Sequence, residues 1–298
     1  MTVYNSPTVH SPKTSQELLS LILKNPQAKI FAGGTFLMNR QDYYNDPIQS
    51  DIISISEISE LSRTIHMDRY LEVGANVTFL DLEESGSLSF SEELNRAFSD
   101  IGNTLIKSRA TVGGALCTDE IRFSVPCFLA AAGTQTEVRT VVKGLFGRIT
   151  TYGRWVPVAK LYDQDGHFAF RRNSFVTKIR IPYELPPYQF FRTAGNPMQD
   201  PDNTVCVGLL FSVNQQKIVM SGFYLVIPSC GMFTSQNFEN RLATSQLPLP
   251  TAMIVRTAQD LVNELQDKFP QATDLVLERT FRLIKTVLFD ANTKFLTE

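Results

Sequence analysis

Residues 28–37 read AKIFAGGTFL and residues 105–117 read LIKSRATVGGALC, and these two stretches decide the fold class of the chain. Each contains an adjacent glycine pair, Gly33-Gly34 or Gly113-Gly114, that follows an apolar segment. Adjacent glycines let consecutive backbone N–H groups converge on an anion, because no side chain stands in the way. A threonine beside each pair adds a hydroxyl donor. Two such loops in one chain predict a long, phosphate-bearing ligand that is held from both sides.

A small α/β unit surrounds the first loop. Thr14-Ser15-Gln16-Glu17 forms a capping box, whose hydroxyl and carboxylate can satisfy N–H groups at a helix start. Apolar residues at helical spacing follow it. Short β-branched or apolar runs predict strands at 29–31, 51–55 and 71–73. The order is therefore helix, strand, glycine loop, strand, strand, which indicates a mixed α/β unit.

Two further units follow along the chain. The first has predicted helices at 78–84, 91–101 and 122–132 and predicted strands at 136–142, 148–152 and 175–181. Pro182, Pro186 and Pro187 then indicate a boundary. Beyond it, strands are predicted at 188–192, 205–213 and 217–228, with 214–216 as a hairpin connection, and helices at 251–269 and 275–289. The last third is thus predicted to be a sheet covered by helices.

Composition limits the function classes. The chain has 298 residues and is 43% hydrophobic, which is enough for a large core and about two domains. Its 28 basic and 30 acidic residues form no dense basic run, so a nucleic-acid groove is not expected. No apolar stretch approaches the roughly 20 residues that cross a bilayer, and no secretory signal pattern opens the chain, so we expect a cytoplasmic protein.

The four cysteines and three histidines are scattered, with no Cys-x-x-Cys spacing. In a chain of this size, such cysteines are typical of reduced, packed thiols. We therefore predict no metal site, no disulfide framework and no catalytic triad based on histidine.

The motifs resemble one known family. An Ala-Gly-Gly-Thr loop (Ala32–Thr35) is followed by an Ile-x-x-Ile-x-x-Leu segment from Ile55 to Leu61 and by Val73-Gly74-Ala75. A Thr-x-Gly-Gly loop (Thr111–Gly114) completes the pattern. In this order and spacing they are similar to the FAD-binding (medium) subunits of molybdenum hydroxylases, the family that includes the xanthine dehydrogenase and carbon monoxide dehydrogenase flavoproteins.

The resemblance implies an α+β fold and a cofactor. It implies a two-part FAD-binding domain of the vanillyl-alcohol oxidase type over 1–183, with lobes at about 1–62 and 63–183. A small C-terminal domain over 184–298 would follow, like that of carbon monoxide dehydrogenase flavoproteins. The FAD pyrophosphate would lie on the two glycine loops. The implied FAD-binding residues are Phe31, Ala32, Gly33, Gly34, Thr35, Phe36, Leu37, Ala110, Thr111, Gly113, Gly114 and Ser124.

The resemblance also implies an electron relay. Iron–sulfur clusters of a partner subunit would pass electrons from a molybdopterin-binding subunit to the flavin, which would reduce NAD or oxygen. The chain would then be an FAD-dependent oxidoreductase subunit that is incomplete without its partners. Because the reactive group belongs to the cofactor, no catalytic side chain is predicted.

Two other functions remain open from the sequence. Three positions depart from the usual family pattern. Phe36 stands where the family usually has a small or acidic residue, and Ala115 stands where it usually has Asn or Asp. Ser124 stands where many members have an Asp. The first alternative is therefore a non-redox docking or scaffold subunit that keeps the fold and binds FAD weakly or not at all. The second is a stand-alone flavin oxidoreductase, which is disfavoured because no residue set for covalent flavin attachment is evident.

Overall fold

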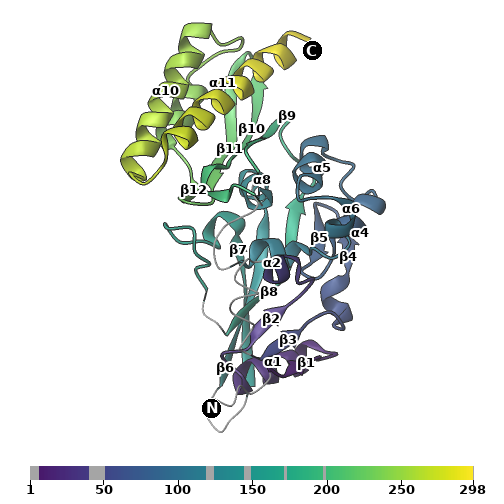
Figure 1. Cartoon of the computed structure of the whole chain (residues 1–298). Coiled ribbons are helices and arrows are strands. Elements are labelled where there is room, and N and C mark those ends of the chain that lie inside the picture. The colour runs from purple at the N-terminus through teal and green to yellow at the C-terminus, as the bar shows by residue number, and fades with distance from the viewer. Residues whose placement is uncertain are drawn as a thin grey trace.

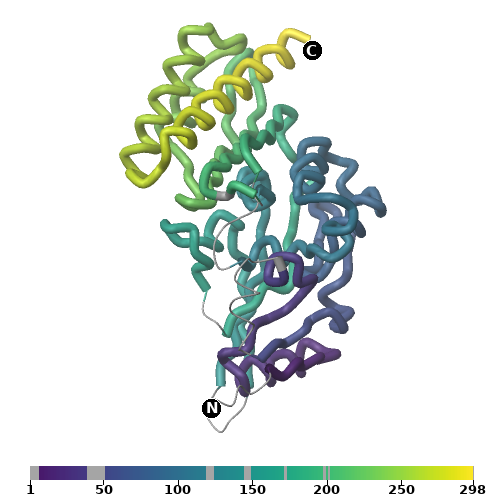
Figure 2. Tube along the Cα trace, viewed as in Figure 1, coloured from purple at the N-terminus to yellow at the C-terminus, as the bar shows by residue number. Residues whose placement is uncertain are grey.

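The computed structural model of the chain describes residues 7–39, 51–118, 124–143, 149–170, 173–196 and 199–297. Three sheets organise these residues into three successive units (Figure 1). In Figure 2 the purple N-terminal segments lie at the end of the molecule opposite the green and yellow C-terminal helices. None of the helices in the described ranges combines the length and the apolar character that a membrane crossing requires.

The N-terminal lobe has a three-stranded parallel sheet in the order β1-β3-β2. Its elements are β1 (Val9–His10), α1 (Ser15–Lys24), β2 (Lys29–Phe31), α2 (Thr35–Asn39), β3 (Ile52–Ser54) and the short helix η1 (Ser59–Ser62). The Thr14 hydroxyl caps α1 by accepting the Glu17 N–H at 3.2 Å, as predicted. Leu18 and Ile22 of α1 then pack on Ile53, and Val141 and Phe175 of the second lobe complete this core.

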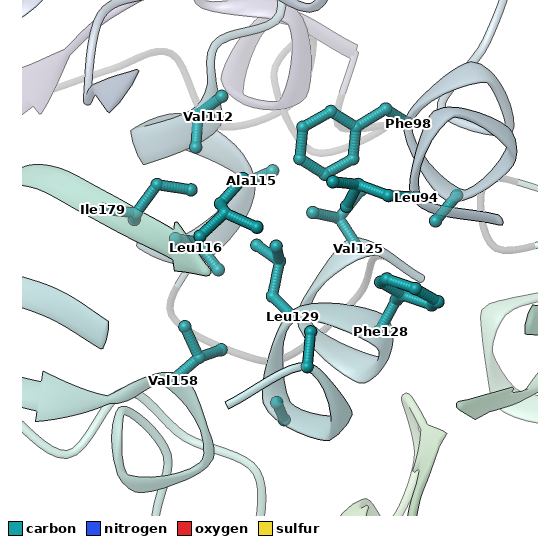
Figure 3. Packing of buried hydrophobic residues seen from close by; sticks show 14 of the residues in the cluster. Leu94, Phe98, Val112, Ala115, Leu116, Val125, Phe128, Leu129, Val158 and Ile179 are labelled. Carbon is teal, nitrogen blue, oxygen red and sulfur yellow. The ribbon is translucent and has the colours of Figure 1, made fainter. Parts of the chain in front are cut away.

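The second lobe has a five-stranded antiparallel sheet in the order β4-β5-β8-β6-β7. Its strands are β4 (Thr64–His66), β5 (Tyr70–Gly74), β6 (Gln135–Lys143), β7 (Ile149–Pro157) and β8 (Ser174–Pro182). Its helices are α4 (Phe79–Glu84), α5 (Glu92–Ser99), α6 (Thr104–Lys107), α7 (Val112–Leu116), α8 (Val125–Ala131) and the short η3 (Val158–Lys160). Figure 3 shows side chains of α5, α7 and α8 meeting beside Ile179 of β8, and together they form the largest core of the chain.

The C-terminal unit is an antiparallel sheet in the order β12-β11-β10-β9 with three helices. Its elements are β9 (Tyr188–Ala194), η4 (Pro201–Asn203), β10 (Val205–Asn214), β11 (Lys217–Ile227), β12 (Gly231–Phe233), α9 (Gln236–Ala243), α10 (Thr251–Lys268) and α11 (Asp274–Thr297). Successive residues along each strand of this sheet point to opposite faces, so alternate residues contribute to two different hydrophobic cores. One face packs on α9–α11, and the other packs on α8 of the second lobe.

Two glycines let α8 approach this sheet closely. A Cβ on Gly222 would lie 2.9 Å from the carbonyl carbon of Ala131, and a Cβ on Gly208 would lie 3.0 Å from the carbonyl oxygen of Cys127. The Cys127 thiol also donates to the Tyr224 carbonyl oxygen at 3.2 Å. Because α8 is buried along its whole length between two sheets, it joins the second lobe to the C-terminal unit.

The structure extends several predicted elements. β7 continues to Pro157, five residues beyond the predicted end, and α11 continues to Thr297, eight residues beyond. The predicted helix 122–132 is found as α8 from Val125, while 122–123 lie outside the described residues. The predicted hairpin is present, and its two central residues, Gln215 and Gln216, both have left-handed φ angles of 49° and 65°. Such a two-residue turn matches the twist of the paired strands.

Candidate functional site

A cavity of about 950 Å³ lies between the first two lobes. Its volume is at the upper end of the range of about 300–1,000 Å³ that is typical of ligand and cofactor pockets. Most of its wall is apolar, with Ile30 and Ile55 from the first lobe and Phe79, Phe168 and Val176 from the second. The two glycine loops run along it.

The cavity brings together ten of the twelve predicted FAD-binding residues. These are Ala32, Gly33, Gly34, Thr35, Phe36, Leu37, Ala110, Thr111, Gly113 and Gly114. Phe31 and Ser124 are not among the described residues that line it. The ring of Phe31 packs against Gly34, where a Cβ would overlap it. Ser124 is 2% exposed and occupies the N-cap position of α8 without making a side-chain cap hydrogen bond.

The first loop offers unpaired donors. Within the described residues, the backbone N–H groups of Gly33, Gly34 and Thr35 donate to no other group. Thr35 begins α2, whose first-turn N–H groups have no carbonyl partner within the helix. Gly34 has a φ of +72°, a left-handed conformation that favours glycine. These three N–H groups can therefore bind an anion that enters the cavity.

The second loop uses its glycines differently. The Gly113 N–H donates to the Ala75 carbonyl at 2.7 Å, and the Gly114 N–H donates to the Thr111 hydroxyl oxygen at 3.1 Å. The prediction that this pair offers unpaired N–H groups is therefore wrong. Gly113 is instead required by packing, because a Cβ there would lie 2.7 Å from the Ala75 Cβ. This contact with Ala75, the residue that follows β5, could not be read from the spacing of the motif.

Thr111 supplies the donors of the second loop. It forms an antiparallel bridge with Thr78, in which the flanking bonds are Phe79 N–H to Ala110 O and Val112 N–H to Val77 O. In this kind of pair the N–H of the central residue points away from the partner strand. Among the residues that the structure describes, the Thr111 N–H has no acceptor. Its hydroxyl proton is also available, since within the described ranges the hydroxyl oxygen accepts from Gly114 and its proton has no acceptor.

The two loops touch each other. A Cβ on Gly33 would overlap the carbonyl oxygen of Arg109 and would lie 2.5 Å from its carbonyl carbon. The unpaired donors of Gly33–Thr35 and of Thr111 therefore line one cavity from two adjacent backbones. The spacing of the motifs predicted two loops that act together, but not that the first glycine is needed for contact between them.

The charge of the cavity wall is positive. In the ranges that the structure describes, the charged residues of the wall are Lys29 on β2 and Arg109 before α7, and no carboxylate lines it. Sequence reasoning missed both. No periodicity marked them, because Lys29 and Ile30 both line the cavity although they are neighbours along β2.

One cysteine lies on the wall. Cys117, which follows α7, is accessible from the cavity but is surrounded by protein. This burial raises the pKa of its thiol to about 12, against a smaller lowering by a backbone hydrogen bond from Val176. The thiol is therefore neutral at physiological pH. Within the described residues, no group of three His, Cys, Asp or Glu side chains could hold a metal ion.

The chain belongs to a known family. Residues 4–184 match the family of the FAD-binding domain in molybdopterin dehydrogenase. This confirms the family that the glycine motifs resemble, and with it FAD as the cofactor. The size of the cavity, its positive wall and its unpaired donors fit a long ligand that carries a diphosphate.

Curated relatives and solved structures agree with this assignment. The chain is similar to the xanthine dehydrogenase FAD-binding subunit of Escherichia coli O157:H7, with 32% identity over 117 residues. It is also similar to the putative subunit of Escherichia coli K12, with 30% identity. Each match spans 39% of this chain and 40% of the relative.

The fold is shared over nearly the whole chain. Quinoline 2-oxidoreductase from Pseudomonas putida 86 superposes with a TM-score of 0.77 at 16% identity, over 98% of both chains. Carbon monoxide dehydrogenase from Hydrogenophaga pseudoflava gives a TM-score of 0.73 at 16% identity, over 96% of both chains. The mixed α and β architecture is therefore that of these oxidoreductase chains.

Proposed function

We propose that the chain is the FAD-binding electron-transfer subunit of a molybdenum-hydroxylase-type oxidoreductase complex. The observation that supports this most directly is the contact between the two loops, which gathers unpaired N–H groups of Gly33, Gly34, Thr35 and Thr111 along one cavity. A diphosphate needs several converging donors, and hydrogen bonds to charged groups are worth about 1.5–3 kcal/mol each. The fold would be the two-part FAD domain of the vanillyl-alcohol oxidase type, over 1–183, with a C-terminal domain over 184–298.

In this proposal the side chains of the chain bind and orient the cofactor. Bound FAD supplies electron transfer in steps of one or two electrons. The apolar residues of the wall, among them Phe79, Phe168 and Val176, would exclude water from the bound cofactor. An iron–sulfur subunit and a molybdopterin-binding subunit in the cytoplasm would deliver the electrons, and NAD or oxygen would accept them.

A flavin titration tests the proposal. Purified chain that is stripped of cofactor should quench the fluorescence of one equivalent of FAD and should acquire the visible absorption of a bound flavin. The matched control is Thr78→Val, which removes the hydroxyl that caps α4 but no donor of the cavity. Wild-type protein that stays colourless and quenches no FAD would contradict the proposed electron-transfer role.

A non-redox docking subunit is the second candidate. It is favoured by the internal hydrogen bonds of Gly113 and Gly114, which leave the second loop with fewer donors than its motif predicts. Ala115 offers no polar group and packs in the core beside Leu116 (Figure 3). This candidate requires binding to partner subunits without measurable FAD affinity. Tight FAD binding in the titration would exclude it.

A further inference from the structure

The cavity wall carries two cations, and none of the described residues that line it is a carboxylate. Lys29 and Arg109 are both exposed, and neither side chain forms an ion pair with another residue in the described part of the chain. By contrast, Lys107, two residues before Arg109, is buried and is paired with Glu83 at 2.9 Å. The sequence around the second loop therefore holds one lysine with a structural ion pair and one arginine that pairs with no carboxylate in the described ranges.

The two cations come from different lobes. Lys29 begins β2, four residues before Gly33, whereas Arg109 ends the turn before Thr111. The carbonyl of Arg109 contacts Gly33, so its backbone stands directly beside the unpaired donors of the first loop. A ligand that spans the cavity thus meets positive charge on both walls.

We propose that Lys29 and Arg109 are specificity-determining residues, which select a ligand with a diphosphate over an uncharged flavin. This rests on the proposed function, because it concerns the same cavity. The N–H groups of the loop bind phosphate oxygens at short range, whereas the cations attract the whole dianion over several ångströms. Among the residues that the structure describes, no carboxylate on the wall offsets that attraction.

The physical consequence is a ligand preference that depends on salt. Exposed charges are screened beyond about 10 Å at 0.1 M salt, but only beyond about 30 Å at 0.01 M. The ratio of FAD affinity to riboflavin affinity should therefore fall as salt rises. Riboflavin has no phosphate, so its own affinity should not change.

The test uses neutral variants of the full chain and three probes. Lys29→Gln and Arg109→Gln are titrated with FAD, ADP and riboflavin at low and high salt, and Lys160→Gln is the control. Lys160 is also exposed, but it lies in η3 and does not line the cavity. Each cavity variant should raise the Kd for FAD and for ADP about tenfold at low salt, as expected for a lost charge-assisted contact. The Kd for riboflavin should stay within twofold.

The outcomes separate this inference from the proposed function. If FAD affinity stays within twofold in both variants, or if riboflavin weakens as much as FAD, the specificity role is overturned while flavin binding stands. If wild-type chain binds ADP in a way that depends on both cations but binds neither flavin, the specificity role stands and the flavoprotein role falls. Wild-type chain that binds none of the three probes overturns both.

Discussion

Gly33→Ala should separate the two loops that form the site. The φ angle of Gly33 is not in the left-handed region, so the effect of alanine is steric alone. The new methyl group would overlap the Arg109 carbonyl oxygen and lie 2.5 Å from its carbon, where packed Cβ atoms keep at least 3.0 Å. Neither partner is a side chain that could rotate away. Overpacking of this kind costs about 1–3 kcal/mol, and two backbones in contact favour the upper end.

Gly33→Ala should also weaken FAD binding. Moving the first loop away from Thr111 weakens at least two charge-assisted hydrogen bonds. Their loss amounts to about 3 kcal/mol, or roughly a hundredfold in the Kd for FAD. Fluorescence titration gives the Kd, and urea denaturation gives the free energy of unfolding.

Gly153→Ala on β7 is the matched control for this prediction. A Cβ at Gly153 would meet only side-chain atoms, with the Glu137 carboxylate oxygen nearest at 3.2 Å. Its free energy of unfolding should stay within about 0.5 kcal/mol of wild type, with unchanged FAD affinity. A folded Gly33→Ala protein that binds FAD within threefold of wild type would show that the loop contact is not needed for the site.

Three further changes have definite outcomes. Burial raises the pKa of Glu72, but Lys178 and Arg180 lower that pKa overall. The stabilising effect of the Glu72 carboxylate is therefore present above about pH 4.5 and is lost as the pH falls below that value. Glu72→Gln should therefore lower the free energy of unfolding by about 1–2 kcal/mol at neutral pH and reduce acid sensitivity in urea titrations; equal stability at neutral pH would contradict this. Gly222→Ala should cost about 2–3 kcal/mol, because the methyl group would overlap a backbone carbonyl of α8, and an unchanged thermal midpoint would refute it. Cys117, with its pKa at about 12, should react with iodoacetamide at least about a hundredfold more slowly in the native chain than in urea, and fast native labelling would disprove that burial.

Local patterns predicted most of the elements. The capping box at Thr14 located the start of α1, because the Thr14 hydroxyl accepts the Glu17 N–H. Strands with a regular alternation, such as β8 and β10, were found within one residue at most ends. The two glycine pairs led to the family and to the cavity, because each pair lies in a short motif of consecutive residues that can be read directly from the sequence.

Long-range contacts were not accessible to this reasoning. The role of Gly113 depends on Ala75, just after β5, and the role of Gly33 depends on the carbonyl of Arg109. Neither partner is marked by composition or periodicity. The family resemblance implies Phe31 as an FAD-binding residue, and it is not among the described residues that line the cavity, whereas its ring packs against Gly34.

The position of α8 has a consequence for how the chain can be divided. The family match ends at residue 184, but one face of the C-terminal sheet covers α8 through Phe191, Cys206 and Leu210. A fragment that stopped near that residue would expose a fully apolar helix to water and would be prone to aggregate. The segment that matches the family is therefore shorter than the segment that is needed to bury α8.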